Sequence, residues 1–423
     1  MSRFYFDIET DGLKSEELAK LIRKVQALTQ DGYETAKENY ELLMNPLKKI
    51  LRLSKQEEEW FLYFWTISEI LTMSRFHSKH DEIVKYAELY YKESELHMER
   101  EIAKCTDPRM AYLNTWIYDE IYGVYSNYHQ IDDAKMDRFM EKFEESALKY
   151  GKAYIYYDDA ISLNFMYRDA DGTKIAARKF KQYENEMQGC YVCGHKQYLA
   201  YLILTDENRQ AEEMMLDLIR KNIPKQYLWC YEYCAEAVPD RMYEMVLYRC
   251  VGAGKESAFR YFYDKYWKKM AYEVQWNESN TSTFRRLLCA AGGTFEHLKE
   301  DLRLTEEDIR ETPHYVTTDN MEIAICWWCY FTLLDRSGVR EVKVKLPGLN
   351  TPDVKTTGED VQAEDGGEST KGTENASKVS TLSVAEYMEK RADEFGALFS
   401  KARARFDYEG LKDTYRNCFL SEN

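Results

Sequence analysis

The sequence predicts an all-α protein, built as a right-handed superhelix of helical hairpins. Three observations favour this fold. The 423 residues include only 7 prolines and 19 glycines, whereas a sandwich, barrel or propeller needs turn residues about every 8–12 positions. Hydrophobic residues make up 44% of the chain, which is enough for a sizeable core. Apolar residues also recur with the helical period over long segments.

Residues 1–14 are expected to form a short N-terminal lead-in, ahead of a helical array that spans residues 15–346. The helical period is clearest in two stripes within this array. One-sided stripes of this kind need a neighbouring helix to bury them. The first stripe consists of Ala211, Met214, Met215, Leu218 and Ile219, and the second of Tyr243, Val246, Leu247, Cys250 and Val251.

Short connections are expected to join the helices in pairs. The segments KNIPKQY and GAGKES follow the two stripes, and links this short place consecutive helices side by side in antiparallel orientation. The predicted hairpins cover residues 152–187, 190–223 and 230–270. Their spacing of roughly 34–40 residues lies in the range of tetratricopeptide-type repeats.

The C-terminal part of the chain differs in composition. Residues 347–381 are expected to form an acidic, disordered linker or loop, because the stretch 351–380 has no aromatic residue and little to bury. The preceding segment VREVKVKLPGL alternates valine and lysine like a short strand. Residues 382–423 are expected to form a C-terminal capping helix that packs back on the array.

The charge balance limits the choice of partners. The 58 Lys and Arg against 74 Asp and Glu give a net charge of −16, so no nucleic-acid partner is expected. The chain has no long apolar run, and MSRFYFDIETDG lacks the pattern of a signal peptide. We therefore expect no membrane partner and a cytoplasmic location, where the ten cysteines stay thiols or metal ligands.

Two close pairs of cysteines predict a structural zinc site. Cys190 and Cys193 form a Cys-x2-Cys pair, and Cys230 and Cys234 lie four positions apart. Hairpin geometry returns the chain to the same end of the array, so the two pairs can meet, and zinc takes four such ligands in a tetrahedron. His195 is the substitute ligand, with His314 also spare. The alternative is that these cysteines are small buried residues of the core.

The same segment resembles a family of bacterial tetratricopeptide-repeat proteins, most of them of unassigned function. In that family a Cys-x2-Cys pair opens one repeat, and a Cys followed closely by Pro opens the next. Cys190, Cys193, Cys234 and Pro239 match this pattern, although Asp240 stands where the family often has His. The resemblance covers most of residues 110–410 and implies a scaffold or binding role, without a reaction.

One motif points to a different class of protein. The segment FYFDIETDGL resembles the first motif of the DEDD exonucleases, in which Asp and Glu at the end of a strand hold two divalent metals. Asp7 and Glu9 have the matching spacing. The chemistry needs two further aspartates in later motifs, and no such motif follows in a matching context.

These observations predict a non-catalytic helical-repeat scaffold that binds a protein or peptide on a preformed superhelical surface. The first alternative is a peptide-responsive regulator, in which the ligand changes the pitch of the superhelix. The second, from a different class, is a metal-dependent exonuclease that uses Asp7 and Glu9.

Overall fold

The chain is described by a computed structural model, in which it forms two compact units. Unit 1 consists of Met1–Ala258 and Ser400–Asp407, and unit 2 of Phe259–Phe399 and Tyr408–Asn423. The structure describes residues 10, 13, 15–29, 40–77, 79–104, 109–187, 190–234, 239–273, 283–293, 318–343 and 378–421.

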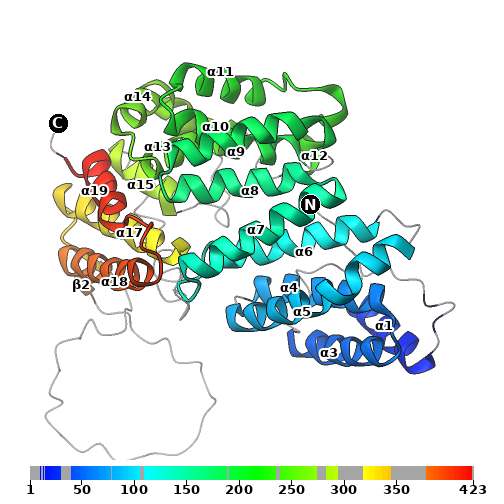
Figure 1. The fold of residues 1–423 in the computed structure, drawn as a ribbon. Helices are drawn as coiled ribbons and strands as arrows, with labels where there is room; N and C mark the ends of the chain where they lie inside the picture. The colour runs from blue at the N-terminus through cyan, green and yellow to red at the C-terminus, as the bar shows by residue number, and fades with distance from the viewer. Residues whose placement is uncertain are drawn as a thin grey trace, which may run out of the picture. The chain divides into compact units, whose positions relative to one another are not determined.

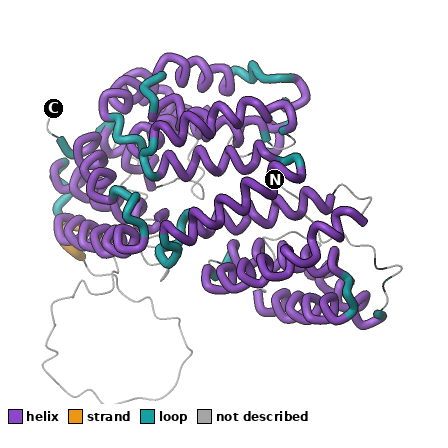
Figure 2. Tube along the Cα trace, viewed as in Figure 1, coloured by secondary structure: helices purple, strands orange, loops and turns teal. Residues whose placement is uncertain are grey.

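Unit 1 is made of helices throughout its described residues (Figures 1 and 2). In chain order they are α1 (Glu16–Thr29), α3 (Tyr40–Gln56), α4 (Trp60–Phe76), α5 (His80–Lys104), α6 (Arg109–Tyr125), α7 (Asp133–Tyr150), α8 (Ala153–Met166), α9 (Ala170–Tyr183), the 3-10 turn η2 (Glu184–Glu186), α10 (Tyr191–Leu204), α11 (Asn208–Ile219), the 3-10 turn η3 (Lys225–Tyr227), α12 (Cys230–Tyr233), α13 (Pro239–Gly252) and the start of α14 (Glu256–Glu273).

Local sequence signals set several of the helix ends. The side chain of Asp132 accepts a hydrogen bond from the Lys135 backbone N–H at 2.7 Å and so caps α7. Gly151 ends the same helix with a φ of 75°, a left-handed conformation that costs glycine little. Asp169 caps α9 in the same way, through the Gly172 N–H at 2.9 Å.

The helices of unit 1 pack in sequential antiparallel order. The pairs α4–α5, α6–α7, α8–α9 and α10–α11 are helical hairpins, and each second helix also packs on the next first helix. The first helices pack on one another in turn, α4 on α6, α6 on α8, α8 on α10 and α10 on α13. They therefore form one continuous layer in unit 1, which we call the first-helix layer.

Aromatic side chains fill much of the space between these helices. The rings of Tyr118 and Phe143 stack at 5.2 Å between α6 and α7, and Tyr90 meets Tyr118 edge to face at 5.6 Å. Tyr90, Tyr118 and Phe143 are buried. The abundant tyrosines thus contribute to helix–helix packing, where each ring buries a large apolar area.

A short C-terminal segment belongs to unit 1 and is anchored by Arg403. This side chain has no exposed surface. Its guanidinium donates to the carbonyl oxygens of Ile131 at 2.9 Å and Tyr128 at 3.1 Å, and also to those of Ser126 and Tyr125. The turn between α6 and α7 is thereby closed by a residue that lies far away in the sequence.

Unit 2 contains the remaining elements. They are the rest of α14, α15 (Thr283–Ala291), α17 (Thr318–Arg336), β1 (Glu341–Lys343), β2 (Lys378–Ser380), α18 (Thr381–Ala402) and α19 (Tyr408–Phe419). β1 and β2 pair in antiparallel fashion, with Val342 opposite Val379. Helix α17 packs against α15 and α19.

The all-α prediction is confirmed for the described residues, whereas the right-handed superhelix and its tetratricopeptide-like repeats stay predictions. The predicted strand before the linker is present as β1. Two boundaries differ from the expectations: residues 378–381 of the predicted linker form β2 and begin α18, and the single capping helix expected over 382–423 is divided into α18 and α19. Residues 347–377 of the linker, and most of the lead-in at 1–14, lie outside the described residues.

Candidate metal centre

The four cysteines of the predicted zinc site come from two segments of unit 1. Cys190 is the N-cap of α10 and Cys193 lies in the first turn of this helix. Cys230 begins the short helix α12, and Cys234 follows its end with an extended backbone. Tyr227 holds the second segment against the first, because its hydroxyl donates to the Met187 carbonyl at 3.0 Å.

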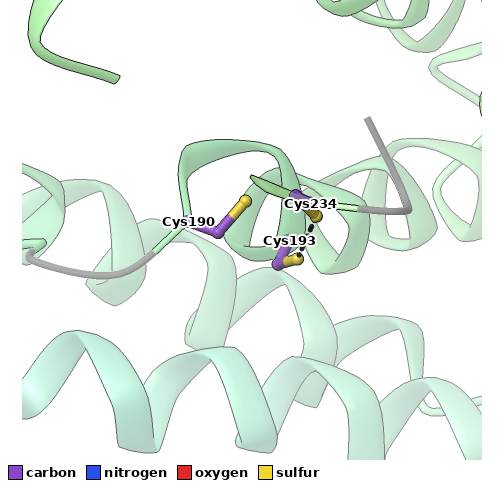
Figure 3. A group of neighbouring side chains, drawn as sticks. All are labelled: Cys190, Cys193 and Cys234. Carbon is purple, nitrogen blue, oxygen red and sulfur yellow. Dashed lines mark hydrogen bonds between the residues drawn. The ribbon is translucent and has the colours of Figure 1, made fainter. Parts of the chain in front are cut away.

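The sulfur atoms meet in the geometry that a metal ion needs. The Sγ atoms of Cys190, Cys193 and Cys234 all lie within 4.8 Å of one another, and those of Cys193 and Cys234 are 3.5 Å apart (Figure 3). A tetrahedron with Zn–S bonds of about 2.3 Å places its sulfurs about 3.8 Å apart. The cluster can therefore bind a metal such as zinc with small adjustments of the side chains.

Cys230 lies at the buried side of this cluster. It has no exposed surface, and its thiol forms a hydrogen bond with the thiol of Cys190. Burial and the bond to Cys190 together raise the pKa of Cys230 from 9.0 to about 11, against the backbone N–H groups of Tyr191 and Val192. The Sγ atom of Cys230 is not among the three that all lie within 4.8 Å of one another, so Cys230 would supply the fourth sulfur after a shift of its side chain.

The electrostatics of the cluster favour a first thiolate at Cys190. A hydrogen bond from the Cys193 thiol lowers the pKa of Cys190 from 9.0 to about 5, helped by the Cys193 backbone N–H and by the thiols of Cys230 and Cys234. The bond to Cys190 raises the pKa of Cys193 in turn. Hydrogen bonds between thiols connect these sulfurs in the metal-free chain, and a bound cation would displace the thiol protons.

The structure does not support His195 as a substitute ligand. Its ring is 1% exposed, and both ring nitrogens are occupied: Nδ1 lies 2.8 Å from the Tyr191 carbonyl oxygen and Nε2 lies 2.7 Å from Glu184 Oε1. The hydrogen bond from His195, together with that from Lys181, lowers the pKa of Glu184 from 4.5 to about 2. His195 therefore stabilises the start of α10, and the cysteines remain the candidate metal ligands. His314 lies outside the described residues.

With Cys230 as the fourth ligand, the coordination of a zinc ion would be complete and would leave no position for a reacting water. Such a set of ligands would suit a structural ion. No other group of three His, Cys, Asp or Glu side chains within such reach is found in the part of the chain that the structure describes. Asp7 and Glu9 lie outside that part, so the exonuclease alternative stays a prediction.

Reasoning from the sequence missed a second polar feature. Asp119, Asp158 and Asp159 come together between α6 and α8. The only signal was a pair of adjacent acids inside the otherwise apolar segment AYIYYDDAISLNFM of α8.

No family model matches the chain, and no curated protein or solved structure is found to be similar to it. The resemblance to bacterial tetratricopeptide-repeat proteins therefore stays a prediction. Among the described helices, none has both the length and the hydrophobicity required to cross a bilayer.

Proposed function

We propose that the chain is a non-catalytic helical-repeat scaffold of the tetratricopeptide type, which binds a protein or peptide partner. The observation that supports this proposal is the first-helix layer, in which α4, α6, α8, α10 and α13 pack in sequence. Consecutive hairpins stacked in this order present an extended surface, the kind of surface on which helical-repeat proteins bind their partners.

The first-helix layer also carries polar side chains suited to recognition. Arg75 of α4 contacts Glu120 of α6 at 3.2 Å, and Arg249 of α13 donates to Gln197 of α10 at 3.0 Å. These contacts run from one first helix to another. A peptide lying across the layer would meet a fixed arrangement of charges rather than flexible side chains, which reduces the entropy cost of binding.

Zinc has a supporting role in this proposal. The ion would join the start of α10 to the segment just before α13, through Cys190 and Cys234. Two consecutive hairpins would then be held in a fixed relation, so that the α10–α13 part of the layer is ordered before a partner arrives.

The proposal is tested by selecting peptides from a displayed library of random sequences against the zinc-loaded full chain. The affinities of selected peptides are then measured for Arg249→Gln, on the first-helix layer, and for Arg209→Gln, on α11 with its side chain 90% exposed. We expect Arg249→Gln to weaken binding several-fold and Arg209→Gln to leave it unchanged. Failure to select any binding peptide, or an effect of Arg209→Gln alone, would contradict the proposal.

A further inference from the structure

Three aspartates from two neighbouring first helices form an acidic seam in unit 1. Asp119 lies on α6, and Asp158 and Asp159 lie on α8. The side chains of Asp119 and Asp159 form a hydrogen bond across the junction of the two helices. Two ionised carboxylates in this contact would repel each other, and the pKa values of both are raised, so we infer that the pair shares one proton.

The acidic seam contains carboxylate oxygens without partners. Asp159 is only 9% exposed. Its Oδ2 atom, and Oδ1 of Asp158, are buried and have no hydrogen-bond partner among the described residues. A buried carboxylate oxygen without a partner is costly, so a donor brought by a ligand would be favourable at these two atoms. Asp119 and Asp158 are half-buried and connect the seam to the surface.

The cations near the acidic seam do not donate hydrogen bonds to these two carboxylate oxygens. Arg75 is bound to Glu120. Arg249 donates to Gln197 and lies 5.1 Å above the ring of Phe165. Lys196, the other cation that acts on Asp158, comes from α10. None of these contacts supplies a donor to Oδ2 of Asp159.

We propose that the acidic seam is a subsite that recognises a cationic side chain, arginine or lysine, of a bound peptide. This inference rests on the proposed function and names the chemistry of its partner. The guanidinium of arginine would take the place of the shared proton and donate to Asp119 and Asp159 together. A planar group with several donors is well suited to bridge two carboxylates.

One observation favours a peptide cation over a metal ion. No three carboxylates among the described residues lie close enough together to share one ion, whereas a guanidinium needs only two carboxylates to form a bridge. The net charge of −16 attracts positively charged partners over a distance and raises their rate of association.

The test uses fluorescence anisotropy with four labelled peptides of equal length, rich in arginine, lysine, glutamate or serine. The zinc-loaded wild type is compared with Asp158→Asn and Asp159→Asn, which keep the shape of the side chain but cannot carry a negative charge. Glu213→Gln is the matched control, because it removes the same charge from α11, where the side chain is 62% exposed. Circular dichroism and thermal unfolding show whether each variant is folded.

We expect the arginine-rich peptide to bind most tightly and the lysine-rich peptide next. Asp159→Asn should weaken both by about tenfold or more, with a smaller loss for Asp158→Asn and none for Glu213→Gln. Binding should also weaken at high salt.

The outcomes separate this inference from the proposed function. If library peptides bind the first-helix layer without a preference for basic residues, or if Asp159→Asn leaves affinity unchanged, the inference fails and the scaffold remains. If no peptide of any composition binds, both fail. A third outcome is that no peptide binds, but Mn²⁺ or Ca²⁺ stabilises the wild type and not Asp159→Asn. This result would assign the acidic seam to a metal ion and overturn the inference.

Discussion

At the scale of single residues, we expect the buried Arg403 to contribute more to the free energy of unfolding than an exposed charged residue does. It is fully buried and satisfies four backbone carbonyls of the α6–α7 turn. Arg403→Ala would leave these acceptors without partners, so we expect a loss of more than about 3 kcal/mol in the free energy of unfolding. Urea denaturation of the full chain measures this loss.

Arg405 provides the matched control for that variant. Its side chain is 44% exposed and contacts Asp133 at 3.2 Å and Asp137 at 2.6 Å. Exposed ion pairs contribute little, so Arg405→Ala should cost less than about 1 kcal/mol. Equal losses for Arg403→Ala and Arg405→Ala would show that the carbonyl contacts of Arg403 are unimportant.

Asp159 should make stability depend on pH in an unusual direction. Burial raises the pKa of Asp159 well above 3.8, and Asp119 and Asp158 raise it further, against Arg75. The folded chain therefore holds a proton that the unfolded chain releases near pH 4, and this contribution to the free energy of unfolding falls as pH rises above about 4.

Asp159→Asn removes that contribution. We expect its midpoint of thermal unfolding to exceed that of the wild type at pH 8, and the difference to disappear near pH 4. Glu213→Gln should show no such pattern. A wild-type advantage at pH 8 would mean that the carboxylate of Asp159 is stabilising as an anion.

The residues of the candidate metal centre and of the acidic seam could be predicted from the sequence only in part, for physical reasons. Cys190, Cys193 and Cys234 could be found because ligand chemistry and short spacing are visible in one dimension. The pairing of His195 with Glu184 was missed, since a buried histidine and a ligand histidine look alike in a sequence. Asp159 was missed as well, because its environment is set by α6 and not by its neighbours in the chain.

At the scale of elements, two of the three predicted hairpins correspond to observed pairs. The α8–α9 and α10–α11 pairs lie within the predicted hairpins 152–187 and 190–223, because short links leave the chain little choice. The segment predicted as a third hairpin, 230–270, instead holds α12, α13 and part of α14, and the boundary between the two units falls within α14. The division between α18 and α19 was not predicted. The segment between the two helices contains Arg403, whose carbonyl partners lie far away in the sequence, and no local signal reports such a contact.

Gly396 tests the packing of α18 on α19 within unit 2. A Cβ atom at this position would lie 2.3 Å from Cγ of Tyr408, which is itself buried and donates to Asp393 at 2.6 Å. Gly396→Ala should therefore destabilise the protein by about 1–3 kcal/mol, although alanine is the better helix former by about 1 kcal/mol.

The exposed neighbour Ala397 serves as the control for this variant. Ala397→Ser should change the free energy of unfolding by less than about 0.5 kcal/mol. A Gly396→Ala protein more stable than the wild type in thermal unfolding would show that Tyr408 can move aside at no cost.

At the scale of the whole molecule, the chain combines two units that are discontinuous in sequence. Residues 400–407 return to unit 1, and the pairing of β1 with β2 brings residues 343 and 378 together. Composition and periodicity were sufficient to predict the all-α class. They could not predict this return of the chain, which depends on tertiary contacts between distant segments.

The central claim is that a metal ion joins two consecutive hairpins of a binding scaffold. Its most direct test is the zinc content of the full chain, purified without chelators and measured by elemental analysis. Cys190→Ser removes one ligand of the cluster. Cys250→Ser makes the same change at a buried cysteine of α13, outside the cluster.

We expect about one zinc per wild-type chain, full loss of zinc with lower thermal stability in Cys190→Ser, and retained zinc in Cys250→Ser, even where that variant is less stable. The contrary result is a metal-free, fully stable wild type in which Cys190, Cys193, Cys230 and Cys234 react freely with a thiol reagent in the native state. Such a protein would show that the cluster is only a contact between small side chains.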